Sequence, residues 1–270
     1  MMIHPTAIIH PDAKVDPSVK VGPYAVIDGQ VSVGPNCVIG PHVHLTGVTT
    51  IGTGNQFHTG CVIGDAPQDL RYKEEPTRVR IADNNVFREH VTVHRSSKLQ
   101  EDTVIGSNNF LMAGSHVGHN CSVGNYVIIA NGALLGGHVT VHDRAFISGN
   151  CLVHQFVRIG TMALMQGGSA ISKDLPPFAI ARGHNGMCGL NAVGMRRAGI
   201  AALERLELKR LYLLLFRSGK KLSVAIEEVR QEFVSPASKT MLEFVAGSKR
   251  GICADTSRRS SPTTESEAEP

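Results

Sequence analysis

The sequence predicts a mainly β protein in which short stacked strands form most of the chain and a small α-helical domain follows. Three observations predict it. Apolar residues recur at every sixth position from Ile3 to Ile171, turn formers gather between them, and the period becomes helical after Met195. Composition agrees, because 270 residues with 42% hydrophobic but only 5% aromatic side chains and no Trp must fill a core with small and branched aliphatics.

The six-residue period includes 27 apolar positions and is interrupted only at Asp69 and Glu75. It predicts that each of these apolar residues, Leu99 included, points into the core. A second, usually small residue precedes each branched one by two places, and such side chains share one face of a strand. Because a six-residue unit cannot bury that face alone, the units must stack. The pattern resembles the left-handed parallel β-helix, in which three hexapeptides make one triangular coil, and the left hand is implied by that resemblance.

The six-residue repeat also indicates the roles of the cysteines and of the segment that interrupts the repeat. Cys37, Cys61, Cys121 and Cys151 fall on the small inward position, which predicts buried thiols rather than disulfides or zinc ligands. Residues 65–78 break the repeat and are dense in polar and charged groups. They are therefore interpreted as a binding loop.

We expect a β-helix domain over residues 1–194, a helical domain over 195–250 and a disordered tail over 251–270. The helical domain should contain three helices, from Met195 to Ser218, from Leu222 to Phe233 and from Ser238 to Val245. It carries 12 basic and 6 acidic side chains, a local +6 that fits a solvated face or an acidic partner equally well.

Neither a membrane span nor a secretory signal is predicted. No stretch approaches the roughly 20 apolar residues that cross a bilayer. The opening residues Met1 to Pro5 lack a basic region followed by an apolar run. A cytoplasmic protein is expected.

The coil geometry predicts that several of the 13 histidines meet at one corner. Residues 18 apart occupy equivalent places on successive coils, about 4.7–4.9 Å apart. His116 and His154 are expected on outward positions of the strands that lead into and out of this corner. The side chains and backbone groups expected to gather there are those of His116, His119, Asn120, Gly137, His138, His154 and Gln155.

Two chemistries fit such a cluster. Three histidines can hold zinc, as in a β-helical hydratase, or one neutral histidine can act as a general base while the others grip a substrate. Gly137 favours the second, because a residue without Cβ beside His119 lets a substrate carbonyl approach the backbone N–H. A base next to an N–H donor is the arrangement that acyl transfer requires.

The combined motifs resemble the UDP-N-acetylglucosamine O-acyltransferases, over essentially residues 1–250. The matching segments are Ser115-His116-Val117-Gly118-His119-Asn120-Cys121, Gly136-Gly137-His138, Val153-His154-Gln155-Phe156, Pro67-Gln68-Asp69-Leu70-Arg71-Tyr72, Glu75-Pro76-Thr77-Arg78 and Arg196-Arg197.

The resemblance implies a role for each matching residue. His119 would deprotonate the sugar 3-hydroxyl, and the Gly137 N–H would meet the thioester carbonyl. Asn191 and Arg197 match positions that bind the nucleotide phosphates or the donor, and Gly167 matches the position that limits acyl chain length. The further substrate-binding residues so implied are Gln68, Asp69, Arg71, His116, Asn120, His138, His154 and Gln155.

The implied reaction moves a 3-hydroxyacyl chain from acyl carrier protein to UDP-N-acetylglucosamine, the first step of lipid A biosynthesis. A homotrimer with active sites between subunits is implied, with no metal and no cofactor. Three positions depart from the family: Asn120 replaces the usual Asp, Arg71 replaces Lys, and Ala198 replaces the second Arg of a pair. Because an amide stabilises an imidazolium less than a carboxylate does, an amine acceptor on a 3-amino sugar nucleotide remains the alternative.

Overall fold

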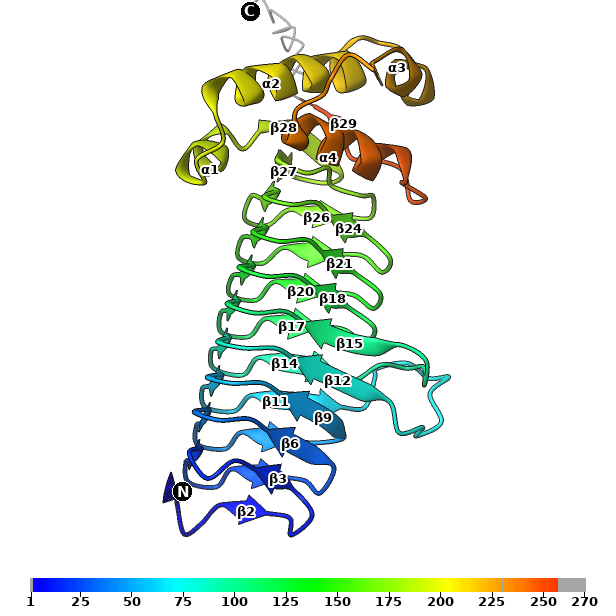
Figure 1. Cartoon of the computed structure of the whole chain (residues 1–270). Helices are drawn as coiled ribbons and strands as arrows, with labels where there is room; N and C mark the ends of the chain where they lie inside the picture. Colours follow the sequence, from blue (N-terminus) through cyan, green and yellow to red (C-terminus); the bar gives the residue numbers. More distant parts are fainter. Residues whose placement is uncertain (1, 230, 257–270) are drawn as a thin grey trace, which may run out of the picture.

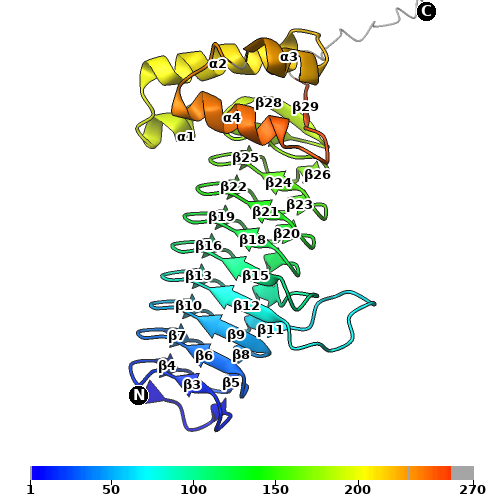
Figure 2. The same ribbon diagram turned by 45° about the vertical axis from the view of Figure 1, so that its right-hand side comes forward.

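The structure, a computed structural model, describes residues 2–229 and 231–256. These residues form a tall triangular solenoid of short strands with helices packed over its C-terminal end (Figures 1 and 2). The strands of the solenoid pair in parallel, and undisturbed coils repeat every 18 residues, as in the pairing of Ile3 with Val21 and Val21 with Ile39. The predicted mainly β fold, a left-handed parallel β-helix, is confirmed.

The strands form three sheets, one for each side of the triangle. The first contains β1 (Met2–Ile3), β4 (Lys20–Val21), β7 (Val38–Ile39), β10 (Gln56–Phe57), β13 (Val86–Phe87), β16 (Phe110–Leu111), β19 (Ile128–Ile129), β22 (Phe146–Ile147), β25 (Leu164–Met165), β27 (Ala179–Arg182), β28 (Gly186–Leu190) and β29 (Ala254–Asp255). The second contains β2 (Ile8–Ile9), β5 (Val26–Ile27), β8 (His44–Leu45), β11 (Val62–Asp65), β14 (Thr92–His94), β17 (His116–Val117), β20 (Leu134–Leu135), β23 (Leu152–Val153) and β26 (Ala170–Ile171). The third contains β3 (Lys14–Val15), β6 (Val31–Val33), β9 (Val48–Ile51), β12 (Arg78–Ile81), β15 (Asp102–Ile105), β18 (Ser122–Val123), β21 (Thr140–Val141) and β24 (Arg158–Ile159).

Two coils are longer than the others. The sequence analysis predicted only one of these two insertions. Phe57 pairs with Phe87 across the predicted loop, whereas Ile81 pairs with Ile105 across a second insertion that the period did not reveal. Leu99 lies in this second insertion and is 44% exposed, so its assignment to the core was wrong. The inserted segment has the length of one repeat, and the apolar period therefore passes through it unchanged.

The inward residues fill the interior as the repeat requires. The four cysteines on the small inward position are buried free thiols, as predicted. Phe57 and Phe87 stack with ring centroids 4.7 Å apart. Three buried asparagines occupy the same small position, and the Asn55 Oδ1 accepts from the Asn85 Nδ2 at 2.9 Å while the Asn85 Oδ1 accepts from the Asn109 backbone N–H. This ladder gives the buried amides hydrogen-bond partners within the protein.

The helices differ from the prediction at their ends. They are α1 (Ala192–Arg197), α2 (Ala202–Arg217), α3 (Leu222–Val229) and α4 (Pro236–Ala246). The single helix expected from Met195 to Ser218 is wrong, because the chain breaks at Gly199, whose φ is +80°. That left-handed conformation suits glycine and ends a helix. The helix expected to reach Phe233 instead ends at Val229.

The C-terminal part of the described chain is ordered beyond the helices. The tail expected from residue 251 is wrong for residues 251–256, since β29 pairs with β28 and Cys253 is buried. Asp255 accepts hydrogen bonds from the Tyr212 hydroxyl and the Arg217 Nε, both at 2.7 Å. Residues 257–270 lie outside the described part. Within that part, no helix has the length and apolar character needed to cross a membrane.

Candidate active site

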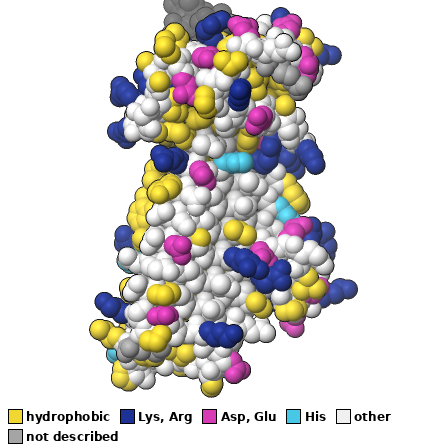
Figure 3. Space-filling model, in the orientation of Figure 1, with side chains coloured by type: hydrophobic (Ala, Val, Ile, Leu, Met, Phe, Trp, Pro, Cys, Tyr) yellow, Lys and Arg dark blue, Asp and Glu magenta, His cyan; other side chains and the backbone are white. Residues whose placement is uncertain are grey.

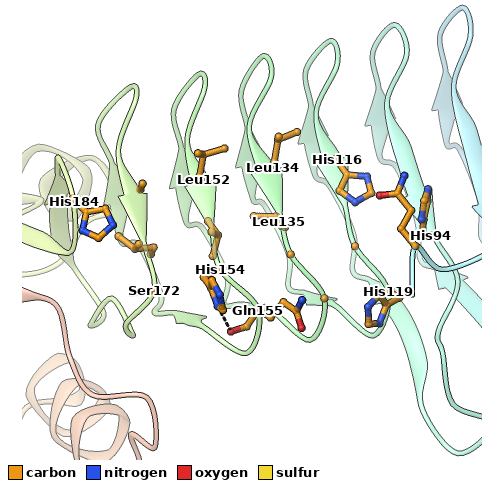
Figure 4. Close-up of a pocket in the computed structure, with 17 residues that line it drawn as sticks. His94, His116, His119, Leu134, Leu135, Leu152, His154, Gln155, Ser172 and His184 are labelled. Carbon is orange, nitrogen blue, oxygen red and sulfur yellow. Dashed lines mark hydrogen bonds between the residues drawn. The ribbon is translucent and has the colours of Figure 1, made fainter. Parts of the chain in front are cut away.

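A cavity of about 460 Å³ lies along the second sheet at the predicted histidine corner (Figure 4). Its floor is formed by outward side chains of successive strands, including Leu134 of β20 and Leu152 of β23. Its polar side is formed by the turns that follow these strands. The predicted site residues that line it are Gln68, His116, His119, Gly137, His154 and Gln155.

His119 and Gly137 lie one above the other in this cavity. A Cβ added to Gly137 would stand 2.6 Å from the His119 Nε2, so only glycine fits beneath the imidazole ring. Within the described chain, the Gly137 N–H has no protein acceptor. The corner therefore places a free backbone donor beside the ring nitrogen that faces the cavity.

The other ring nitrogen of His119 is held by Asn120. The His119 Nδ1 lies 2.8 Å from the Asn120 Oδ1, and the Ser97 backbone N–H donates to the same oxygen at 3.0 Å. Because a backbone N–H can only donate, its partner must be the amide oxygen rather than the amide nitrogen. The His119 Nδ1 consequently carries the hydrogen, and Nε2 keeps a lone pair toward the cavity.

His94 is a site residue that the sequence analysis missed. It is 7% exposed, lines the cavity and packs edge-on against His116, with ring centroids 5.0 Å apart. Burial lowers the pKa of His94, and it lowers the pKa of His116 to about 4. His116 is therefore neutral at pH 7, with its Nδ1 2.7 Å from the Thr92 hydroxyl.

The hidden insertion explains why His94 was missed. Thr92 pairs with His116, 24 residues later rather than 18. Counting 18 residues per coil therefore does not place His94 next to His116. His184 and Ser172 also line the cavity and were not predicted. His184 follows β27, after the hexapeptide period has ended, and the repeat gives no signal for it.

The remaining corner residues lie in different relations to the cavity. His154 lines it but follows β23 of the same sheet as His116, so its expected place on the strand leaving the corner was wrong. Its Nδ1 lies 3.3 Å from the Gln155 carbonyl oxygen (Figure 4). His138 lies behind His119, edge-on to it with centroids 5.2 Å apart, and stacks on Phe156.

The predicted binding loop, residues 65–78, brings Gln68 to the cavity wall. Asp69 and Arg71 form a bidentate pair beside it, with the Arg71 Nε and Nη2 donating at 3.1 and 3.0 Å. This pairing lowers the pKa of Asp69 to about 2. The Arg71 side chain is 89% exposed. The loop is anchored by Arg95, which donates to the Tyr72 hydroxyl and to the Gly64 carbonyl.

Three predicted residues lie away from this cavity. Asn191 and Arg197 line a second cavity of about 400 Å³ beside β22 and β25, on the first sheet. Asn191 caps α1 there by accepting from the Gly194 N–H, and its Nδ2 donates to the Met162 carbonyl. Gly167 lies in the turn between β25 and β26 and lines neither cavity. Within one chain these residues do not meet the histidines.

Among residues 2–229 and 231–256, no group of three or more His, Cys, Asp or Glu side chains is arranged to hold a metal ion. The arrangement can remove a proton at the His119 Nε2 and donate a hydrogen bond from Gly137 to an oxygen nearby.

Comparison with known proteins agrees with this chemistry. Residues 174–253 match the family described as UDP N-acetylglucosamine O-acyltransferase, domain 2, and residues 12–47 and 102–137 match the bacterial transferase hexapeptide. The acyl-[acyl-carrier-protein]–UDP-N-acetylglucosamine O-acyltransferase of Syntrophobacter fumaroxidans is 44% identical over 256 residues, 93% of this chain and 99% of that protein. The enzyme so named from Thermodesulfovibrio yellowstonii is also 44% identical, over 93% of this chain and 98% of its own length.

Solved structures give the same result. The UDP-N-acetylglucosamine acyltransferase of Francisella novicida superimposes with a TM-score of 0.92 at 33% identity, covering 100% of both chains. That of Bacteroides fragilis superimposes with a TM-score of 0.89 at 38% identity, covering 93% of this chain and 99% of its own. The chain therefore belongs to the UDP-N-acetylglucosamine O-acyltransferase family.

Proposed function

We propose that the protein transfers a 3-hydroxyacyl chain from acyl carrier protein to the 3-hydroxyl of UDP-N-acetylglucosamine, the first step of lipid A biosynthesis. The observation that carries this proposal is the His119 imidazole lying over Gly137, at the polar edge of a cavity with an apolar floor. The family membership supports the substrates. A cytoplasmic location belongs to the same proposal.

The proposed mechanism uses the two faces of the His119 ring. Nε2 removes the proton from the sugar hydroxyl while that oxygen attacks the thioester carbonyl. The Gly137 N–H hydrogen-bonds the oxyanion that forms, and collapse of the tetrahedral intermediate breaks the C–S bond. The imidazolium then returns its proton to the departing thiolate. Neutral His116 and His94 fit the role of uncharged hydrogen-bonding groups for the sugar.

The active site of this proposal lies between subunits of a homotrimer. The histidine cavity lies on the second sheet, whereas Asn191 and Arg197 lie beside the first. This separation suits a substrate that binds between the second sheet of one chain and the first sheet of a neighbouring copy. Exposed apolar side chains on the second sheet support contact with a neighbouring subunit. In the single chain, Leu134 is 42% exposed and Leu152 is 51% exposed.

Acyl carrier protein is the proposed donor, and its acidic surface suits the positively charged helical region. Lys and Arg side chains are visible over the helices in Figure 3. Arg205, Lys209 and Arg217 line a groove beside α2, although Arg217 is paired with Asp255. Arg210 is also paired, with Glu232 at 3.0 Å. Lys209 is thus a better candidate for a carrier contact than Arg210.

The proposed reaction is tested directly by its product. Purified protein is incubated with 3-hydroxyacyl carrier protein and either UDP-N-acetylglucosamine or its 3-amino analogue. We expect mass spectrometry to find an ester on the 3-oxygen of UDP-N-acetylglucosamine. Product from the amino analogue alone would instead establish N-acylation, and absence of product from both acceptors would contradict the proposed function.

The acyl chain length gives a further prediction. The family resemblance assigns Gly167 to the position that limits acyl chain length, and a Cβ built there would lie 3.6 Å from the Gly149 carbonyl oxygen, an ordinary contact. Gly167→Met is therefore expected to fold and to shift selectivity toward shorter acyl chains. Loss of fit for two methylenes changes the ratio of kcat/KM between donors about tenfold. Competition between long- and short-chain carrier substrates measures the ratio, and an unchanged ratio would place the length limit elsewhere.

A further inference from the structure

The inserted segment between β14 and β15 packs on the side of Asn120 that faces away from the cavity. Its side chains surround the Asn120 amide. The Asn120 Nδ2 donates to the Ser96 Oγ at 2.6 Å and to the Glu101 Oε2 at 2.8 Å, while the amide oxygen accepts from Ser97. The Asn120 backbone is held as well, because its N–H donates to the Thr103 hydroxyl at 2.8 Å.

The oxygen and the nitrogen of the Asn120 amide each have a partner that can act only as a hydrogen-bond donor or only as an acceptor. The Ser97 backbone N–H can only donate, and an ionised Glu101 carboxylate can only accept. Lys98 lies 2.8 Å from the Glu101 Oε1, and this hydrogen bond is the main cause that holds the pKa of Glu101 below its usual value. The carboxylate is therefore ionised at neutral pH, and its second oxygen is directed to Asn120.

A continuous chain of contacts thus joins a carboxylate to the proposed base. It runs from Glu101 to the Asn120 Nδ2, through the amide to Oδ1, and on to the His119 Nδ1 at 2.8 Å. A hydrogen bond from the amide N–H to an anion increases the negative charge on the amide oxygen, because such bonds polarise one another. The amide oxygen then accepts the His119 N–H more strongly than an isolated amide would.

We propose that Glu101 is a positioning residue for His119, and that Glu101 and Asn120 together supply the negative partner that a single Asp supplies elsewhere in the family. The inference rests on the proposed function, since it assigns His119 as the base. Glu101 fixes the Nδ1–H tautomer and stabilises the imidazolium that forms during transfer. It acts through the amide and does not touch the substrate.

Several other charged or titratable groups face this assembly. His119 interacts with Asp69 of the inserted loop, with His94 and His116 on the second sheet, and with His138 of the next coil. Glu101 itself faces Lys98 and lies 3.7 Å from the His138 Nδ1. Asp69 and Glu101 are the carboxylates in this set. Asp69 is committed to Arg71, whereas Glu101 is in hydrogen-bond contact with the partner of His119.

Four variants test the proposal, alongside His119→Ala as the reference for loss of the base. Glu101→Gln keeps the size of the side chain but removes its charge. Asn120→Asp combined with Glu101→Gln moves the carboxylate next to His119. The third is Asn120→Asp alone, which sets two carboxylates within contact and should not exceed the wild-type rate. Glu228→Gln removes a carboxylate from a comparable exposed pair with Lys220 and is the matched control.

Glu101→Gln is expected to lower kcat about tenfold, the effect of losing one charge-assisted hydrogen bond in the transition state. KM should change less than about twofold. The acidic limb of the kcat/KM profile should move to lower pH, because removing a nearby negative charge disfavours the imidazolium. The double variant should restore kcat, and Glu228→Gln should match the wild type.

Nitrogen chemical shifts of protein labelled with ¹⁵N-histidine give a readout that needs no turnover. We expect the His119 signals, identified by their absence from His119→Ala, to titrate at lower pH in Glu101→Gln. Wild-type kcat and titration in Glu101→Gln, or failure of the double variant to restore kcat, would overturn the proposal. Retained activity in His119→Ala would instead reject the proposed base, and the histidine titration alone would then decide whether Glu101 acts on this ring.

Discussion

His119→Ala is expected to lose about 10²–10⁴ in kcat while keeping its fold, the usual contribution of a positioned general base. Its backbone carbonyl still accepts from the His138 N–H, so the coil stacking does not depend on the ring. The ring contacts His138 edge-on and is 9% exposed, and its loss leaves a small polar space at the cavity wall. Steady-state kinetics with acyl carrier protein and UDP-N-acetylglucosamine measure the loss.

His10→Ala provides the control for this experiment. His10 is a histidine near the N-terminus, with its side chain 54% exposed beside Asp12, and it lies outside the cavity. Its removal should leave kcat unchanged. Circular dichroism and the apparent size in solution should be the same for both variants and the wild type. A near-normal kcat for His119→Ala with intact structure would show that another group removes the proton.

The fold could be predicted because each coil repeats the same local rule. One branched and one small inward residue in every six define the strands, and stacking follows from burial alone. The rule also placed His119 over Gly137, since both lie in the undisturbed run of coils. Counting coils fails at the second insertion, because its six residues leave the phase of the apolar period unchanged.

Most errors arise at this insertion or beyond the repeat, whereas His154 was assigned to the wrong strand within an undisturbed coil. An insertion with the length of one repeat placed Leu99 in the core and separated His94 from His116 in the sequence count. The ordered residues 251–256 could not be foreseen, because Cys253 and Asp255 are held by distant partners rather than by any local pattern. The Glu101 contact likewise depends on how the insertion folds back onto Asn120.

One buried ion pair joins the solenoid to the helical region. Asp174 is fully buried and accepts from the Arg158 Nε at 2.9 Å and from the Ser248 hydroxyl at 2.9 Å. Arg158 also donates to the Phe244 carbonyl of α4, and its guanidinium lies 4.3 Å from the centre of the Phe244 ring. Two segments far apart in the sequence therefore share one buried charge pair.

Asp174→Ala is expected to lower the free energy of unfolding by about 3 kcal/mol, because it leaves the Arg158 guanidinium without its carboxylate in a largely buried site. This value is at the low end of the usual destabilisation for breaking a buried ion pair, because the Arg158 side chain remains 28% exposed and can reach water. Urea unfolding followed by circular dichroism, at one protein concentration, measures the change. Glu228→Gln breaks a pair whose side chains are both about half exposed, and it should change stability by less than about 1 kcal/mol. Equal stabilities for the two variants would contradict the proposed contribution of the Asp174 carboxylate to stability.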